Sequence, residues 1–313
     1  MKLMNFGQVL AGTAALACTF ALAAPRVEAA DWVYSWDSFN DGTGYLNQNG
    51  ANPNSTTHGV GYQSDFEFFG MAVLEDLAND RVTFAFNTNL ALTGWGSSPN
   101  IGMGDLFINL DPTKTFTQAE GTESLLAIRF AETNDSGLEG TGVFSHVVGQ
   151  NVTQSNQGWK SYSGYEKYVT GKKGTVEYID GMTNAEAKAY LGAHGESVVR
   201  AGTGVKLGDV SVITDVAALA AMGLSFTAAA ADAGLSSPAL GTQTYAVSFA
   251  RSLLPAGELN WIAHIMAECA NDIMGTSGTF AAIPPEKEDV PEPMALAAFA
   301  LVGVGMIGAR KRN

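Results

Sequence analysis

Val82-Thr-Phe-Ala-Phe-Asn87 alternates bulky apolar side chains with smaller or polar ones along six residues. Successive side chains of a β-strand point to opposite faces of a sheet, so Val82, Phe84 and Phe86 share one face of this segment. Thr244–Phe249 repeats the pattern. Both segments are therefore predicted to be strands with one face buried in an apolar core.

Further segments with this alternation are spread along the chain, between stretches rich in glycine, asparagine, serine and threonine. The chain contains 36 glycines and shows no regular succession of strand, helix and strand. These features predict a mainly β fold, an antiparallel β-sandwich that is jelly-roll-like. The further predicted strands are Trp32–Phe39, Asp65–Leu74, Asp105–Leu110, Leu125–Phe130, Val143–Val148 and Trp261–Glu268.

One or two short helices are expected beside the sheets. Thr183 and Glu186 form a capping box, in which each side chain bonds the backbone N–H of the other residue. A second helix, Val216–Met222, can be capped by Thr214 or Asp215. Neither helix is long enough to form a layer of its own.

The first 29 residues have the order of a secretory signal peptide. Lys2 precedes an apolar region at 9–24, and Val27-Glu-Ala29 places small residues before a cleavage point. We expect cleavage after Ala29 or Ala30, which predicts an exported protein. A retained N-terminal membrane helix is the alternative, and the glycine and polar residues within the apolar region disfavour it.

The segment 290–313 joins three features in a fixed order, a Pro-Glu-Pro triplet, an uncharged apolar run at 294–309 and a basic cluster. The run has 16 residues. A helix over it would span about 24 Å, less than the roughly 30 Å of a hydrocarbon core. We expect a short transmembrane helix over 294–309, with the basic cluster held in the cytoplasm. The residues that carry this signal are Pro291, Glu292, Pro293, Arg310, Lys311 and Arg312.

This C-terminal segment resembles the PEP-CTERM sorting signal that bacterial exosortases read. Six further stretches carry a second resemblance: Asp37-Ser-Phe-Asn-Asp-Gly42, Gly104-Asp-Leu-Phe107, Ile128-Arg-Phe-Ala131, Thr133-Asn-Asp-Ser136, Ser252-Leu-Leu-Pro255 and Glu268-Cys-Ala-Asn-Asp272. On these stretches the chain is similar to a family of exosortase-dependent bacterial surface proteins. The resemblance implies processing by signal peptidase and exosortase, transient membrane anchoring, and a final place in the cell envelope, on the cell surface or in the extracellular matrix. It also implies a setting of exopolysaccharide production, and it supplies no activity.

These assignments divide the chain into a signal peptide (1–29), a β-sandwich surface domain (30–280), a linker (281–289) and the sorting signal (290–313). Residues 30–289 keep 12 basic and 29 acidic residues, which gives a net charge near −17. Nucleic acid is not an expected partner, because this charge would repel its phosphates. The charge is compatible with divalent cations or neutral polysaccharide as partners, and it also serves solubility alone.

Residue patterns for covalent chemistry are sparse. Cys269 is the one cysteine outside the predicted signal peptide, so no internal disulfide is expected, and we predict a buried, inert thiol. The chain has no nucleophile elbow and no phosphate-binding glycine loop. The expected role is therefore non-enzymatic, as a surface or matrix component or as a module that contacts polysaccharide. A secreted glycan-active hydrolase and a purely structural coat protein are the alternatives.

Oxygen-bearing side chains are concentrated in Asp37-Ser-Phe-Asn-Asp-Gly42, and Asn134-Asp135 and Asn271-Asp272 add similar groups. Carboxylate and amide oxygens are the ligands that Ca²⁺ prefers, although the spacing is not that of an EF-hand. Ordinary Asx turns are the alternative interpretation. No other cofactor is expected. The candidate calcium ligands are Asp37, Asn40 and Asp41.

Two tryptophans in predicted loops are candidates for stacking on sugar rings. Trp95 lies between two glycines, and Trp159 lies close to Tyr162 and Tyr165 in the chain. An exposed tryptophan face is unfavourable in water unless a ligand covers it. Packing against the core is the alternative for both residues, and it is the favoured one for Trp95.

Overall fold

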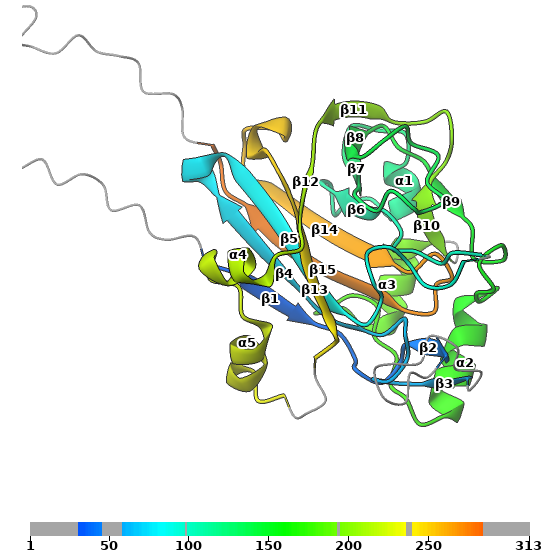
Figure 1. Ribbon diagram of the computed structural model, residues 1–313. Coiled ribbons are helices and arrows are strands. Elements are labelled where there is room, and N and C mark those ends of the chain that lie inside the picture. Colours follow the sequence, from blue (N-terminus) through cyan, green and yellow to red (C-terminus); the bar gives the residue numbers. More distant parts are fainter. Residues whose placement is uncertain (1–30, 46–57, 98, 193–194, 236–239, 284–313) are drawn as a thin grey trace, which may run out of the picture.

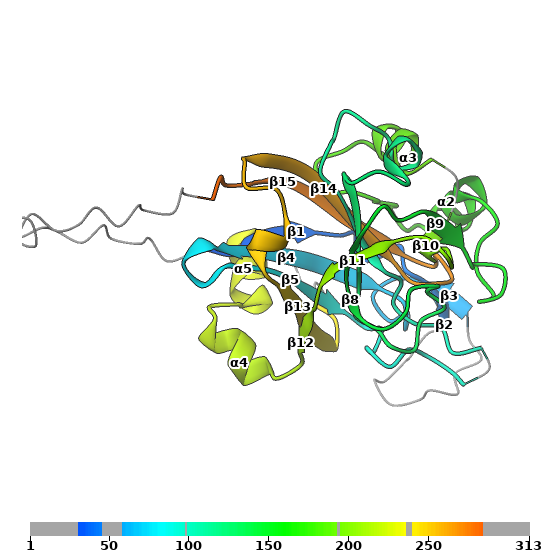
Figure 2. The same cartoon turned by 90° about the horizontal axis from the view of Figure 1, so that it is seen from above.

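The computed structural model describes residues 31–45, 58–97, 99–192, 195–235 and 240–283. Within these ranges the chain is mainly β, with antiparallel sheets and a few short helices, as predicted. Two large sheets lie one above the other (Figure 1 and Figure 2). The predicted signal peptide, the linker beyond Ile283 and the predicted sorting signal with its helix over 294–309 lie outside the described residues.

The first sheet has five strands in the order β1-β4-β5-β13-β12, and all neighbours in it are antiparallel. Its centre is formed by the segment Arg81–Thr88 and its partners, so the alternation in the sequence marks the middle of this sheet. The strands are β1 (Val33–Trp36), β4 (Phe68–Asp76), β5 (Arg81–Thr88), β13 (Gln243–Phe249) and β12 (Ser211–Ile213).

The second sheet has six strands in the order β11-β8-β7-β6-β14-β15, again antiparallel throughout. Its strands are β11 (Val205–Gly208), β8 (Gly142–Ser145), β7 (Leu125–Arg129), β6 (Leu106–Asn109), β14 (Leu259–Met266) and β15 (Ile273–Phe280). Two small ribbons lie beside the sheets, formed by β2 (Thr43–Tyr45) with β3 (His58–Val60), and by β9 (Gly149–Asn151) with β10 (Glu196–Val199).

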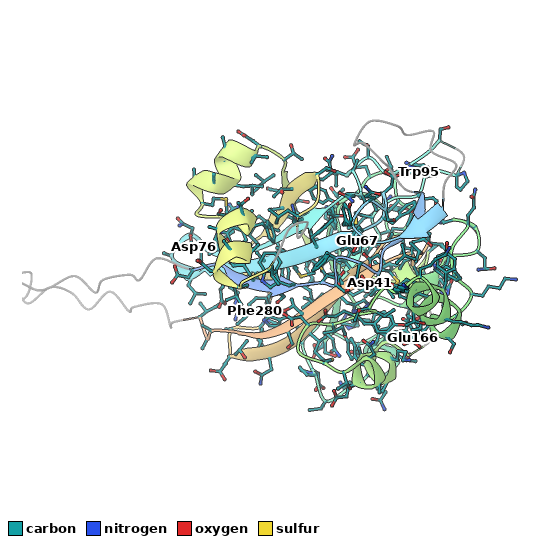
Figure 3. The ribbon with its side chains drawn as sticks, turned by 90° about the horizontal axis from the view of Figure 1, so that it is seen from below. Asp41, Glu67, Asp76, Trp95, Glu166 and Phe280 are labelled. Atoms are coloured by element: carbon teal, nitrogen blue, oxygen red, sulfur yellow. The ribbon has the colours of Figure 1, made fainter. Side chains whose placement is uncertain are left out.

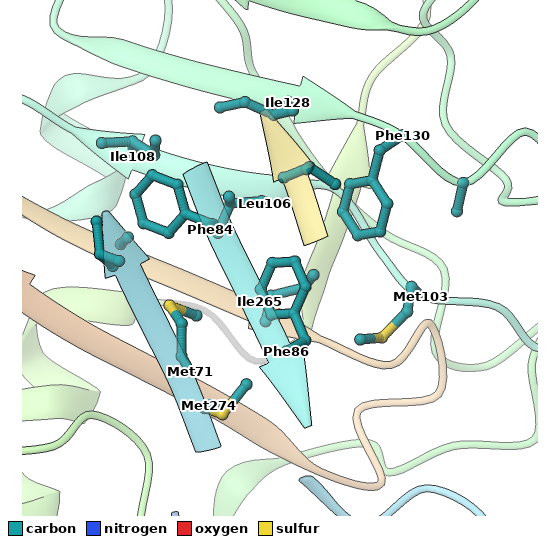
Figure 4. Close-up of a cluster of buried hydrophobic side chains, with 14 of the residues drawn as sticks. Met71, Phe84, Phe86, Met103, Leu106, Ile108, Ile128, Phe130, Ile265 and Met274 are labelled. Carbon is teal, nitrogen blue, oxygen red and sulfur yellow. The ribbon is translucent and has the colours of Figure 1, made fainter. Parts of the chain in front are cut away.

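Side chains from both sheets fill the space between them (Figure 4). Phe84 of β5 meets Trp261 of β14 edge to face, with ring centroids 5.7 Å apart, and Phe86 stacks on Phe130 at 5.6 Å. Val82, Phe84 and Phe86 are fully buried, so the predicted core face is confirmed. Burial of each aromatic side chain stabilises the fold by about 2–3 kcal/mol.

Helices cover the outer faces of both sheets. On the first sheet, Ala72, Ala85 and Ala246 form a shallow surface against which Phe226 packs. On the second sheet, Phe107 contacts Phe116 edge to face at 5.0 Å. The helices are α1 (Phe116–Ala119), α2 (Tyr162–Gly171), α3 (Asn184–Leu191), α4 (Val216–Ala221) and α5 (Phe226–Asp232), with 3₁₀ turns η1 (Leu77–Asn79) and η2 (Arg251–Leu253).

Both helices predicted from capping signals are confirmed. α3 begins at the capping box of Thr183 and Glu186, and Asp215 caps α4 by accepting a hydrogen bond from the backbone of Ala217. The other three helices were not predicted. Among the described residues, none of the helices combines the length and the apolar character needed to cross a bilayer.

The first and last described residues leave the domain at the same end (Figure 1 and Figure 2). β2, β3 and α2 lie at the opposite end, beyond the far ends of the large sheets. This second end carries the candidate functional site.

Candidate functional site

Four acidic side chains are buried together at the α2 end of the domain, and each comes from the margin of a strand. Asp37 directly follows β1, Asp41 precedes β2, and Asp272 directly precedes β15. One carboxylate oxygen from each of these three lies within 4.8 Å of the other two. Glu67, directly before β4, lies against Gly42, the residue after Asp41, and Figure 3 labels Glu67 and Asp41. We call Asp37, Asp41, Glu67 and Asp272 the acidic cluster, and each of its members is 7 % exposed or less.

Backbone N–H groups fix two members of the acidic cluster. Asp272 accepts hydrogen bonds from Phe68 at 2.7 Å and from Ile273 at 2.9 Å, one on each carboxylate oxygen. Oδ2 of Asp41 accepts one from Glu177 at 2.8 Å. The bond from Phe68 joins the start of β4 to the start of β15, and the bond from Glu177 joins the loop that precedes β2 to the segment between α2 and α3.

Other oxygens of the acidic cluster accept no hydrogen bond from the described residues. They are Oδ2 of Asp37, Oδ1 of Asp41 and both carboxylate oxygens of Glu67. A Cβ atom at Gly42 would lie 2.5 Å from Oε2 of Glu67, so only glycine permits this close approach. Burying a carboxylate without a partner is strongly unfavourable, so the acidic cluster requires either protons or a cation.

Burial raises the pKa of all four carboxyl groups well above their usual range. The negative charge of Asp272 raises the pKa of the other three further. The N–H groups of Gly42 and Asp41 oppose the rise in the pKa of Glu67, although neither makes a hydrogen bond of good geometry with it. In the described part of the chain, the charged neighbours that shift these pKa values are all acidic, and Glu177 is one of them.

Asp105 shows how this chain satisfies a buried carboxylate elsewhere. It accepts hydrogen bonds from Nδ2 of Asn134 at 3.0 Å, from the hydroxyl of Ser136 at 2.6 Å and from the N–H of Val199 at 2.9 Å. Asp105 is fully buried, as is Glu67. Both oxygens of Asp105 accept hydrogen bonds, whereas neither oxygen of the equally buried Glu67 does. The acidic cluster therefore differs from an ordinary buried carboxylate of this chain.

The predicted calcium ligands are only partly brought together. Asp37 and Asp41 meet in the acidic cluster, whereas the Oδ1 of Asn40 accepts hydrogen bonds from the N–H of Thr175 at 2.8 Å and from the hydroxyl of Ser38 at 2.9 Å. The predicted set of three ligands stays a prediction. The sequence reasoning did not place Glu67 in it, although a charged residue inside the apolar run Phe66–Phe69 is a sign of a buried, partnered carboxylate.

A pocket of about 340 Å³ opens beside the acidic cluster, which is within the usual size range of ligand sites. Half-buried Trp159 and Tyr168 form its aromatic wall, with ring centroids 5.0 Å apart. The remaining lining comes from β2, from the loop before α2 and from the turn before β15. We call it the Trp159 pocket, and its lining residues are Thr43, Gly44, Gln157, Gly158, Trp159, Tyr168 and Asn271.

Trp159 is held in place from two sides. Its Nε1 donates a hydrogen bond to the hydroxyl of Thr43 at 2.8 Å, and its backbone N–H donates to the carbonyl oxygen of Cys269 at 3.2 Å. A Cβ atom at Gly158 would lie 1.8 Å from that same carbonyl oxygen, so the loop approaches as closely as glycine allows. The aromatic wall is therefore preorganised.

Trp95 lies apart from this pocket. Its ring meets Phe66 edge to face at 5.7 Å and packs against the main core, and its backbone pairs with Ile101. Cys269 is buried, as predicted, and burial raises the pKa of its thiol. His264 stacks on Phe107 at 5.5 Å on the outer side of the second sheet, where burial lowers its pKa to about 3.

The Trp159 pocket combines an aromatic wall with amide and hydroxyl groups. Such a lining suits a neutral ligand with an apolar C–H face and a polar rim, as in a sugar ring. The described residues that line it include no carboxylate. Comparisons of the chain with protein-family models, with curated proteins and with solved structures give no match.

Proposed function

We propose that this is an exported, exosortase-sorted protein of the cell envelope, cell surface or extracellular matrix, which contacts exopolysaccharide without cleaving it. Signal peptidase removes residues 1–29, and exosortase acts on residues 290–313, so the helix over 294–309 anchors the chain only transiently. The mature domain (30–280) is a jelly-roll-like β-sandwich on a stiff linker, residues 281–289. The features that support sorting are Pro291, Glu292 and Pro293 with the basic cluster Arg310, Lys311 and Arg312.

The observation that carries the binding role is the aromatic wall of the Trp159 pocket. Trp159 presents a large apolar face while its N–H group is already bonded to Thr43. Because its N–H group already has a partner, this indole is stabilised mainly when a ligand covers its exposed apolar face. Gln157, exposed on the rim, adds an amide group that suits sugar hydroxyls.

The orientation of the domain supports a surface role. Both ends of the described domain lie together, and the Trp159 pocket lies at the opposite end (Figure 1). Attachment through the chain beyond Ile283 would therefore leave the pocket directed away from the anchor. This is the arrangement expected of a module that meets a matrix polymer.

Binding to immobilised exopolysaccharide from exosortase-bearing bacteria tests this role. We expect Trp159→Ala to weaken retention by at least about tenfold. Loss of a central aromatic contact commonly makes the binding free energy less favourable by about 1.4 kcal/mol or more, which corresponds to this factor. Trp32→Ala provides the matched control, since Trp32 lies outside this pocket and bonds the carbonyl oxygen of Met222. It should leave retention unchanged.

Other outcomes would contradict the proposal in distinct ways. Release of reducing sugar by the wild-type protein would favour the glycan-active hydrolase. Equal retention of the wild-type protein and the Trp159→Ala variant would remove the pocket from the binding surface. A folded wild-type protein that binds no polysaccharide would favour the structural coat protein.

A further inference from the structure

When ionised, the four carboxylates of the acidic cluster carry negative charge that no basic side chain among the described residues neutralises through an ion pair. Asp37, Asp41, Glu67 and Asp272 are buried, and the charged neighbours that shift their ionisation are acidic as well. The Arg251–Glu75 pair shows that the chain can provide a buried arginine for a carboxylate, with Nε 2.7 Å from Oε1. No ion pair with a member of the acidic cluster occurs among the described residues.

Glu67 gives an independent sign of a missing positive partner. Its side chain is fully buried, and neither carboxylate oxygen accepts a hydrogen bond from the described residues. The carboxylate lies against Gly42, and the negative charges of Asp272 and Asp41 both raise its pKa, so it is close to the other acids of the cluster. Asp37 and Asp41 each keep one unbonded oxygen, and one carboxylate oxygen from each lies within 4.8 Å of one from Asp272, a group of three that does not include Glu67.

The chemistry of these donors selects a hard cation. All four side chains offer oxygen, whereas zinc sites are built mainly from nitrogen and sulfur. Calcium takes about six to eight oxygen ligands at roughly 2.3–2.6 Å, and it accepts irregular geometry. Magnesium keeps several of its waters and binds to one or two carboxylates, which four closely packed carboxylates do not suit.

We propose that Asp37, Asp41 and Asp272 bind one calcium ion, and that the buried carboxylate of Glu67, beside Asp41, becomes a fourth ligand when the ion binds. The ion joins the end of β1, the loop before β2, the start of β4 and the start of β15. The site goes beyond the proposed contact with polysaccharide, because its first effect is on the stability of this end of the domain. Since Thr43 and Asn271 lie within two residues of ligands, the ion also supports the Trp159 pocket.

Calorimetry and thermal unfolding of the full chain, first stripped with a chelator, test the site with calcium chloride as the probe. We expect one calcium ion per chain. At a calcium concentration one hundredfold above Kd, Tm should rise by about 5–10 °C. Magnesium chloride should give a smaller rise at the same concentration.

Glu67→Gln keeps the shape of the side chain and removes its charge. This variant should be at least as stable as the wild-type protein in chelator, because one repulsive charge is gone, and it should lose the calcium-dependent rise in Tm. Glu139→Gln is the matched control, since Glu139 is exposed in a loop, and it should respond to calcium as the wild-type protein does. If Glu67→Gln does not fold, Asp37→Asn serves the same test.

Three results would overturn the calcium site. The first is the absence of both a heat of binding and a Tm shift with calcium up to about 10 mM. The second is an equal Tm shift with calcium in Glu67→Gln and in the wild-type protein, and the third is a Tm shift with magnesium as large as that with calcium. If calcium does not bind but the protein is still retained on polysaccharide, the calcium site is wrong and the proposed function stands. If calcium binds but the protein is not retained on polysaccharide, the proposed function is wrong and the calcium site stands.

Discussion

Trp159 donates a hydrogen bond from Nε1 to the hydroxyl of Thr43 at 2.8 Å, across 116 positions of the chain. Thr43 also donates its backbone N–H to the carbonyl oxygen of Asn271 at 2.8 Å. Both Thr43 and Asn271 lie within two residues of a member of the acidic cluster. The wall of the pocket and the acidic cluster therefore share two short backbone segments.

Thr43→Val removes the hydroxyl while keeping the branched shape. Thr43 is 2 % exposed, and the part-buried indole N–H of Trp159 would lose its hydrogen-bond partner. We expect the free energy of unfolding to fall by about 1–3 kcal/mol, measured by urea denaturation. Thr227→Val, at an exposed position of α5, should change it by less than about 0.5 kcal/mol. Equal effects of the two substitutions would contradict the role of this bond.

Gly158→Ala tests the close approach of the pocket loop to the turn before β15. The added methyl group would lie 1.8 Å from the carbonyl oxygen of Cys269, so the loop must move. We expect a loss of about 1–3 kcal/mol in the free energy of unfolding and weaker retention on polysaccharide. Gly171→Ala is the control, because no atom lies within 4 Å of its added Cβ. Unchanged stability of Gly158→Ala would show that the loop is not held there.

Arg251→Met tests the support of the last strand. Arg251 is fully buried and donates to Oε1 of Glu75 and to the carbonyl oxygens of Pro255, Gly257 and Ala281. Removal of the cation leaves these acceptors unpaired, and we expect a loss of about 3–5 kcal/mol in the free energy of unfolding. Arg200→Met, at an exposed position, should cost far less. A loss below about 1 kcal/mol for Arg251→Met would contradict this assignment.

Stability should depend on pH differently with and without calcium. Burial raises the pKa of the acidic cluster, which Tyr165 and Glu177 also face, so the folded state holds protons that the unfolded state has released. In chelator, the free energy of unfolding should fall as the pH rises from about 5 to about 8. Calcium should reduce this slope, because it binds the ionised carboxylates.

Part of the slope should persist in saturating calcium. Burial raises the pKa of Glu196 and of Glu268 to about 7, with Glu120 adding to the first and Asp135 and Asp105 to the second. Both groups lie outside the acidic cluster, so calcium does not neutralise them. Identical pH profiles in chelator and in calcium, followed by thermal unfolding, would contradict the linkage.

Strands such as β5 and β13 were predictable because their side chains alternate, whereas β15 and the short strands β2, β3 and β9 to β12 were not predicted. Val82–Asn87 lies within β5, and the two hydrophobic faces of the sheets follow the pattern. α2 was missed although the sequence carries its signal: Tyr162, Tyr165 and Val169 recur at the helical spacing i, i+3 and i+7, and Ser161 caps its start. Where this helix packs depends on contacts with residues far away in sequence, which periodicity does not contain.

The candidate site was predictable only where its residues are close in the chain. Asp37 and Asp41 share one short stretch, and the sequence marks them as oxygen donors. Glu67 joins them because β4 runs beside β1, a pairing that no local pattern encodes. Asn40 has the right chemistry, but its Oδ1 accepts hydrogen bonds from Thr175 and Ser38.

Mass spectrometry of the native protein, purified from the cell surface or the matrix, tests export and sorting most directly. Cleavage after Ala29 or Ala30 predicts an N-terminus at Ala30 or Asp31, and exosortase processing predicts that no peptide from Met294–Asn313 is recovered. An intact Met294–Asn313 peptide in the surface form would contradict a disposable sorting signal and would identify the segment as a permanent part of the protein.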